Sequence, residues 1–134
     1  MEATNPATGE QLAVYDEDDD GDVEATLETA QSTFEEWRDV PLREREQLLE
    51  NAADVLRENK QKYAELMTEE MGKPISQAIG EIEKCAWACD HYAEHAHTYL
   101  SEDHHPSPPG TEVKTVHDPL GPVLAVMPWN YPFW

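Results

Sequence analysis

Basic residues are scarce in this sequence. Its 134 residues contain 9 Lys and Arg against 29 Asp and Glu, so the formal net charge is −20. Because such a negative field repels a phosphate backbone and an anionic bilayer alike, we expect neither nucleic acid nor a membrane as a partner. The acidic residues are spread over the whole chain, which is typical of a surface adapted to high salt, where screening removes the repulsion. The other interpretation is an ordinary acidic protein that carries one charged loop.

Long apolar runs are also missing, and cysteines are few. No run approaches the roughly 20 apolar residues of a spanning helix, and the N-terminus is polar, so we expect a cytoplasmic protein. The two cysteines, Cys85 and Cys89, lie four residues apart in a helical pattern, which favours reduced thiols over a disulfide. His91 and His95 would point about 80° to 160° away from them around that helix. The four side chains therefore cannot converge on one zinc ion, and no metal site is expected.

Apolar residues recur at helical spacing between residues 22 and 100, which predicts a layer of four amphipathic helices. Asp22 is the expected N-cap of the first helix, Pro41 begins the second, and the second ends near Asn59. In the first helix, the residues expected to face the core are Val23, Leu27, Ala30, Phe34 and Trp37. In the second, the glutamates expected to lie mostly outside are Glu44, Glu46, Glu50 and Glu58.

A Gly-Lys-Pro sequence separates the third and fourth helices. Gly72 suits the left-handed conformation at the end of the third helix, and Pro74 opens the fourth. The fourth helix is expected to be the longest, because its apolar residues alternate three and four apart without a break up to Leu100. Such a seam would also suit a coiled-coil adaptor. Its length of roughly 26 residues, beside three shorter amphipathic helices, favours a packed helical layer instead.

Strand signals are confined to the two ends of the chain. Gln11 to Tyr15 can form one short strand. Residues 101–110 are expected to be a proline-rich loop, and residues 111–117 alternate apolar and polar side chains, which predicts an exposed or interface strand. Val123 to Met127 form a short, branched apolar run bounded by prolines, which predicts a buried strand that ends at Met127.

Two prolines bracket an asparagine directly after this predicted last strand. Pro128 and Pro132 lack N–H donors and fix φ, so the backbone between them is expected to be a rigid turn that presets the Asn130 amide. A side-chain N–H held at the carboxyl end of a strand can donate to an oxyanion as negative charge develops on a carbonyl oxygen. The alternative is an Asx turn, in which the same side chain hydrogen-bonds only the local backbone.

The turn carries a resemblance to a known family. Met127-Pro-Trp-Asn-Tyr-Pro132 is similar to the PWNFP-type signature of the aldehyde dehydrogenase superfamily. Nearly the whole chain shares the likeness, through Asn5-Pro-Ala-Thr-Gly-Glu10, through Glu70-Met-Gly-Lys-Pro-Ile75 with Glu81 and Glu83-Lys84, and through Pro119-Leu-Gly-Pro-Val-Leu-Ala-Val-Met127. Within the family, Glu70 to His95 is most similar to the succinate-semialdehyde dehydrogenase branch.

The resemblance implies an α/β fold class, namely the N-terminal part of a Rossmann-like cofactor-binding domain with four amphipathic helices followed by strands. Residues 1–134 would be an incomplete N-terminal portion, truncated before the parallel sheet is complete. Its parts are a helical layer at 22–100, a proline-rich loop at 101–110, and strands with the signature turn at 111–134.

For function, the resemblance implies the oxidation of a small-molecule aldehyde to the acid with NAD or NADP. Asn130 would donate its side-chain N–H to the oxyanion. Met127, Pro128, Trp129 and Asn130 would lie along the cofactor, and Tyr131 would face the substrate tunnel. A homo-oligomer is implied for the full-length enzyme.

Several parts of that chemistry are missing from the sequence. The family's nucleophilic cysteine, its general-base glutamate, the lysine that holds the adenosine ribose and the glycine turn at the pyrophosphate have no counterpart here. Family members run to several hundred residues, so we expect this chain to be a fragment that is inactive alone. The alternative is a non-catalytic helical interaction module or a decayed remnant that docks on a second polypeptide.

Overall fold

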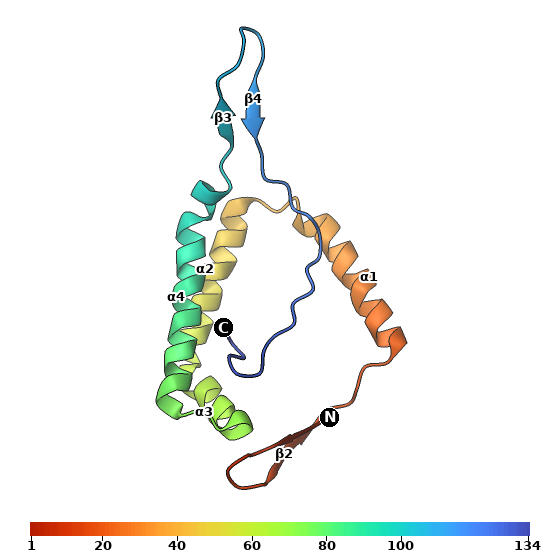
Figure 1. Cartoon of the computed structure of the whole chain (residues 1–134), viewed down its shortest axis with the longest axis vertical. Helices are drawn as coiled ribbons and strands as arrows, with labels where there is room; N and C mark the ends of the chain where they lie inside the picture. Colours follow the sequence, from red (N-terminus) through yellow and green to blue (C-terminus); the bar gives the residue numbers. More distant parts are fainter.

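Four α-helices form the body of the protein in a computed structural model that describes all residues 1–134. The helices are α1 (Asp20–Trp37), α2 (Leu42–Glu58), α3 (Lys60–Met71) and α4 (Ile75–Tyr99). In Figure 1, α2 and α4 run side by side, α3 lies at one end of this pair, and α1 stands apart on the other side of the C-terminal segment. None of the four helices combines the length and hydrophobicity needed to cross a bilayer.

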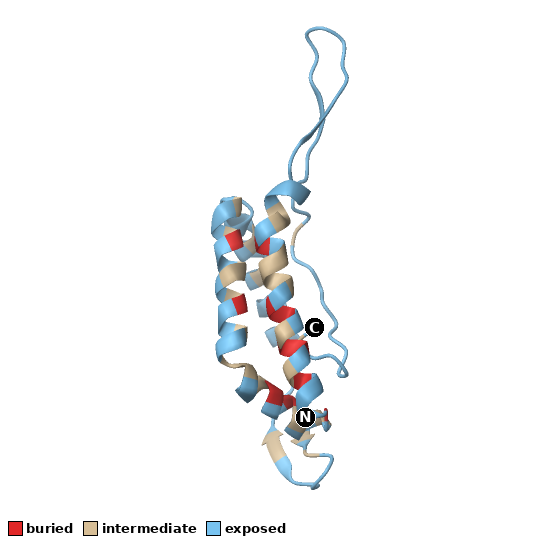
Figure 2. Ribbon diagram, turned by 90° about the vertical axis from the view of Figure 1, so that its left-hand side faces the viewer, coloured by how far each residue is buried: buried red, intermediate tan, exposed pale blue.

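The core lies among α2, α3 and α4, where the buried residues gather (Figure 2). It is built largely from small side chains. Its central cluster consists of Ala64, Met67, Ala78 and Ile82. Alanines on facing helices let the helix axes approach closely, and Ile82 is the largest side chain that is fully buried. The predicted helical layer is therefore confirmed for these three helices, with α4 packed along α2 of the same chain.

Most predicted helix ends agree with the structure. Pro41 and Pro74 stand at the N-caps of α2 and α4, and Asn59 stands at the C-cap of α2. Gly72 ends α3 with a φ of 72°, and its N–H donates to the Thr68 carbonyl at 3.0 Å. Helix α4 is the longest, with 25 residues.

The predicted N-cap of α1 was wrong by three residues. Asp19, not Asp22, caps the helix, because its carboxylate accepts the N–H groups of Gly21 at 2.8 Å and Asp22 at 3.0 Å. Asp22 Oδ2 in turn accepts the Asp19 N–H at 3.0 Å, which completes a reciprocal capping box. In a run of consecutive aspartates, periodicity alone did not identify the capping residue.

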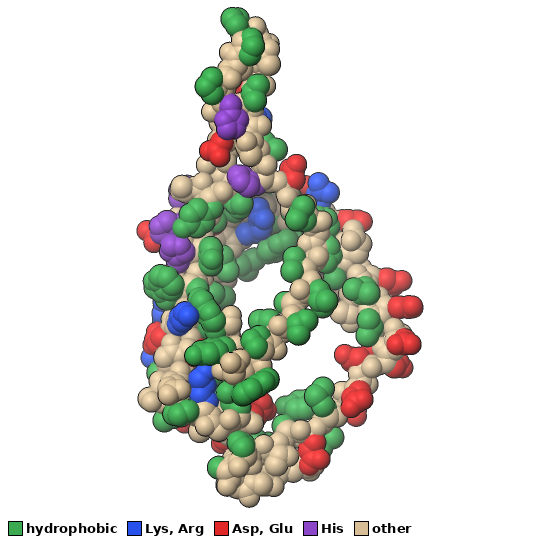
Figure 3. All heavy atoms as spheres, viewed as in Figure 1, with side chains coloured by type: hydrophobic (Ala, Val, Ile, Leu, Met, Phe, Trp, Pro, Cys, Tyr) green, Lys and Arg blue, Asp and Glu red, His purple; other side chains and the backbone are tan.

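The prediction that the apolar face of α1 is core was also wrong for this chain. No residue of α1 is buried, and Leu27 is 63% exposed. The C-terminal half of the helix lines a pocket with residues 121–123 of the C-terminal segment, through Ala30, Thr33, Phe34 and Trp37. Figure 3 shows acidic side chains along the outer edge of α1 and hydrophobic ones along the C-terminal segment.

Glu46 departs from the expectation that the glutamates of α2 lie outside. It is only 7% exposed, because α4 covers it with Ala93 and His97. Its carboxylate lies 3.5 Å from Arg43 Nη1 and 3.9 Å from His97 Nδ1.

The strands form two antiparallel hairpins at opposite ends of the molecule (Figure 1). The predicted strand near residues 11–15 is confirmed as β2 (Gln11–Val14), and it pairs with an unpredicted β1 (Glu2–Thr4). The predicted strand at 111–117 is confirmed at its centre as β4 (Val113–Thr115). It pairs with β3 (Asp103–His105), so the prediction that residues 101–110 are all loop was wrong there.

Val123 to Met127 form neither a strand nor a buried segment, which corrects the sequence prediction. No other strand lies beside this run to exchange backbone hydrogen bonds with it. Val123, Leu124 and Val126 are 85% exposed or more. A branched apolar run can serve as one strand of a sheet, but a second strand must lie beside it and pair with it.

Candidate functional site

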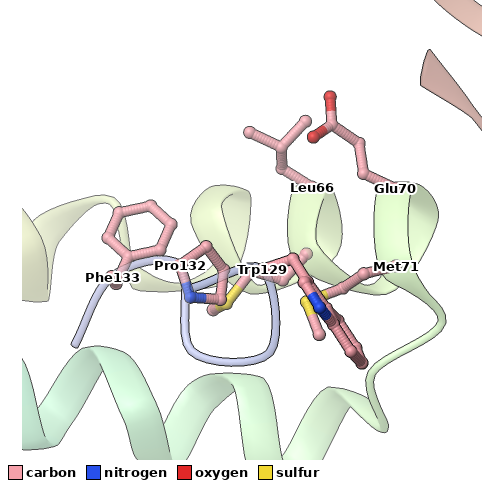
Figure 4. Close-up of a pocket in the computed structure, with 7 residues that line it drawn as sticks. Leu66, Glu70, Met71, Trp129, Pro132 and Phe133 are labelled. Atoms are coloured by element: carbon pink, nitrogen blue, oxygen red, sulfur yellow. The ribbon is translucent and has the colours of Figure 1, made fainter. Parts of the chain in front are cut away.

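The predicted signature turn lies between α3 and α4 (Figure 4). Trp129, Pro132 and Phe133 line a pocket of about 320 Å³ whose other wall belongs to α3. That wall consists of Leu66, Met67, Glu70 and Met71. Phe133 packs against the core cluster, with its ring centroid 5.3 Å from that of Tyr63. Apolar contacts with α3 therefore hold one side of the turn.

A buried ion pair between Lys73 and Glu81 holds the other side. Lys73 is 8% exposed and Glu81 is 4% exposed, and the Lys73 ammonium donates to Glu81 Oε2. Glu81 Oε1 accepts the backbone N–H of Phe133 at 2.9 Å and that of Trp134 at 3.2 Å. Lys73 Nζ also donates to the Asn130 carbonyl oxygen at 3.2 Å. Both ionic side chains thus bind backbone groups of the turn.

Aromatic contacts accompany these hydrogen bonds. Lys73 Nζ lies 4.1 Å from the ring centroid of Tyr131, and Lys84 Nζ lies 3.7 Å from that of Trp134. Both distances are within the range in which an ammonium is attracted to the face of an aromatic ring.

The environment of Glu81 favours its ionised form. Burial raises the pKa of this carboxyl, but the hydrogen bonds from Lys73, Phe133 and Trp134 outweigh burial, and the net pKa is lowered. The carboxylate is therefore charged at neutral pH, as its role as acceptor for two N–H groups requires.

The side chain of Asn130 is exposed and accepts or donates no hydrogen bond within the chain, whereas its main-chain oxygen is bound by Lys73. An Asx turn would need an N–H two or three residues later. Pro132 has none, and the Phe133 N–H donates to Glu81. The structure therefore does not contain the Asx turn, and the Asn130 amide is free to meet a ligand.

The other predicted site residues surround Asn130 along the chain but differ in their contacts. Met127 is 60% exposed and Trp129 is 81% exposed, so both present apolar surface to solvent. Pro128 lies between them in the chain. Tyr131 lies against α4 beside a polar hollow that Gln77 and Lys84 also line. Their roles toward cofactor and substrate remain predictions.

The two cysteines have the surroundings of packing residues. They line an apolar pocket together with Leu56, Ala88, Tyr92, Phe133 and Trp134. Burial raises the pKa of the Cys85 and Cys89 thiols, the opposite of what a nucleophile needs. His91 and His95 stack on each other at 4.4 Å, and no group of three metal-binding side chains comes together in the chain.

The motifs of the sequence include Lys73 and Glu81, but no role was predicted for either residue. One feature of the sequence could have indicated a role for Glu81. Glu81 lies three residues after Ala78 and four before Cys85, which places a charged residue within the apolar seam of α4. A carboxylate at a buried helical position needs a cationic or N–H partner, and Lys73 was one candidate.

Two curated relatives resemble the chain over 97% of its length. A probable succinate-semialdehyde dehydrogenase [NADP(+)] of Synechocystis sp. is 44% identical, and a succinate semialdehyde dehydrogenase [NAD(P)+] of Escherichia coli is 40% identical. The chain spans about 28% of the length of each.

A solved structure agrees with these relatives. The crystal structure of a succinic semialdehyde dehydrogenase from Streptococcus pyogenes, in complex with NADP+, superposes with a TM-score of 0.90 at 34% identity. The match covers 98% of this chain and 29% of that one. It confirms the predicted fold class, in which four helices and short strands form part of a Rossmann-like cofactor-binding domain. The sequence profile of the aldehyde dehydrogenase family matches residues 1–134, and the chain therefore belongs to that family.

Proposed function

We propose that this chain supplies the oxyanion-binding turn of an enzyme that oxidises an aldehyde with NAD or NADP. The observation that carries the proposal is the Asn130 amide, which is exposed and free of internal hydrogen bonds on a turn held from both sides. A donor that is fixed before the reaction costs no reorganisation when charge develops beside it.

The reaction assigns Asn130 a defined step. A cysteine sulfur of the enzyme adds to the aldehyde carbon, and the carbonyl oxygen becomes an oxyanion. The Asn130 side-chain N–H donates to that oxygen. Transfer of the aldehyde hydrogen as hydride to the oxidised cofactor would then give a thioester, and water would hydrolyse the thioester to the carboxylic acid and the free thiol. Removing one oxyanion donor typically costs about 3 kcal/mol of transition-state stabilisation.

The residues beside Asn130 fit one side of a nicotinamide cofactor. Bound NAD or NADP supplies the hydride acceptor. Met127, Pro128 and Trp129 offer exposed apolar surface against which a flat ring can lie. Lys73 and Lys84, which contact this segment, are engaged with Glu81, Tyr131 and Trp134, so the proposal leaves the cofactor phosphates to groups in another part of the enzyme.

The names of the relatives favour succinate semialdehyde as the substrate. The names of both curated relatives and of the Streptococcus pyogenes structure specify this aldehyde. The alternative, a non-catalytic helical module that docks on a second polypeptide, is favoured by one observation, the exposed apolar face of α1.

A fusion enzyme tests the proposed function. Residues 1–134 replace the matching 130-residue segment of the Synechocystis relative, and NADPH formation is followed with succinate semialdehyde. We expect the fusion enzyme to form NADPH only when the inserted segment is present, and residues 1–134 alone to form none. A soluble, cofactor-binding fusion without turnover would contradict the proposal. Turnover by the chain alone that Cys85→Ala or Cys89→Ala abolishes would contradict the expected inactivity.

A further inference from the structure

We propose that Lys73 and Glu81 are positioning residues that set the direction of the Asn130 amide. The inference rests on the proposed function, in which Asn130 binds the oxyanion. It goes further because neither side chain touches substrate or cofactor in that account. Each acts through the backbone of the turn.

The two side chains bind the backbone that follows the Asn130 Cα, at two successive points along the chain. Lys73 Nζ binds the Asn130 carbonyl oxygen at 3.2 Å, which fixes the plane of the peptide that follows the Asn130 Cα. Glu81 Oε1 binds the N–H groups of Phe133 and Trp134 at 2.9 and 3.2 Å. With Pro132 fixing φ between these contacts, little backbone freedom remains to the turn.

Both anchors lie on rigid parts of the fold. Lys73 stands between Gly72, in the left-handed conformation, and Pro74 at the N-cap of α4. Glu81 lies in the second turn of α4 next to fully buried Ile82. A group held on a helix, as Glu81 is, is placed more accurately than one held on a loop, and misplacement by 1 Å can cost about 100-fold in rate.

A positioning role differs from a stabilising one in its energetics. Desolvation of two charges largely cancels their attraction, so replacing a buried ion pair by apolar side chains of similar size often leaves stability unchanged. The replacement still removes the hydrogen bonds to Asn130, Phe133 and Trp134. Lys73→Met with Glu81→Met therefore separates the two roles.

The chain also offers a matched control. Lys60 on α3 and Glu83 on α4 form another ion pair, and neither residue contacts the signature turn. Lys60→Met with Glu83→Met removes one positive charge from α3 and one negative charge from α4. Any effect that this control shares with the first pair is not an effect on the turn.

The first measurement is amide hydrogen exchange at Phe133 and Trp134 in the 134-residue chain. Glu81→Gln, which keeps the size of the side chain, serves here in case the double methionine variant does not fold. We expect at least tenfold faster exchange at both amides than in wild type, and no change in the Lys60/Glu83 control. Unchanged exchange in Glu81→Gln would overturn the inference without any activity measurement.

The second measurement is kcat, KM for NADP+ and melting temperature of the fusion enzyme. For the Lys73/Glu81 methionine pair we expect kcat to fall on the order of 100-fold, with KM for NADP+ and melting temperature near wild type. The kcat of Glu81→Gln should fall less, because its amide oxygen can still accept a hydrogen bond from Lys73, which keeps the bond from Lys73 to the Asn130 carbonyl. A variant with wild-type kcat, or one whose kcat falls only in step with its folded fraction, would overturn positioning.

Failure of the inference can be told from failure of the proposed function. If Asn130→Ala lowers kcat and the Lys73/Glu81 pair does not, the oxyanion assignment stands and the positioning role is wrong. If Asn130→Ala leaves kcat unchanged, the proposed function fails. Faster amide exchange in the Lys73/Glu81 variants would then show that these residues hold the turn without affecting catalysis, which also contradicts the positioning role.

Discussion

The Glu81 carboxylate is buried and yet has a lowered pKa, because three hydrogen-bond donors surround it. At the scale of single residues, this group links the helical layer to the turn that carries Asn130. Its ionisation therefore couples the order of the turn to pH.

Acid should release this link. Because the folded-state pKa of Glu81 lies below its unfolded value, its contribution to stability is complete above the unfolded pKa and is lost as pH falls through the folded one. We expect Glu81→Gln to be less stable than wild type at pH 7 and to approach it below about pH 4. Urea unfolding of both proteins at several pH values measures the difference. A gap that stays constant or widens in acid would contradict the assignment.

The elements show where local sequence signals suffice and where they do not. Gly72, Pro74 and Pro41 marked helix ends correctly, because a left-handed glycine or a missing N–H acts within one turn of chain. The exposure of α1 and the unpaired run at 123–127 were not predictable, because burial and strand pairing depend on distant partners. The predicted turn itself was located correctly, whereas its anchors, 52 or more residues away in sequence, were missed.

Two glycines of the α3–α4 region should respond oppositely to alanine. Gly72 has a φ of 72°, and an added Cβ would meet Pro6 Cγ at 3.2 Å, so Gly72→Ala should destabilise by about 1–2 kcal/mol. Gly80 lies within α4 with open space around it, so Gly80→Ala should stabilise by about 0.5–1 kcal/mol. Chemical denaturation measures both. Two changes of the same sign would show that one of these backbone conformations is misassigned.

At the scale of the whole molecule, charge dominates. The net charge of −20 is borne by a chain in which only 11 of 134 residues are buried, so mutual repulsion acts against a small core. We propose that the surface is adapted to high salt, which would screen this repulsion.

Molar salt should therefore stabilise the fold. We expect the melting midpoint to rise from millimolar to molar KCl, mostly over the range in which the Debye length falls from about 30 to 3 Å. Sucrose, which is excluded from protein surfaces without screening charge, is the control. A midpoint that stays flat or falls with KCl would remove the halophilic interpretation.

The most direct test of the account is Asn130→Ala in the fusion enzyme, with kcat and melting temperature measured on the same preparation. Because the side chain makes no internal hydrogen bond and acts on charge that exists mainly in the transition state, kcat should fall about 100-fold or more. Melting temperature and KM for NADP+ should stay close to wild type. Asn51→Ala, at an exposed asparagine on α2 whose side chain accepts a hydrogen bond from Gln47 at 3.3 Å, is the control away from the turn. A large loss of stability with unchanged kcat per folded molecule would contradict the account and leave Met127 to Pro132 as a structural corner.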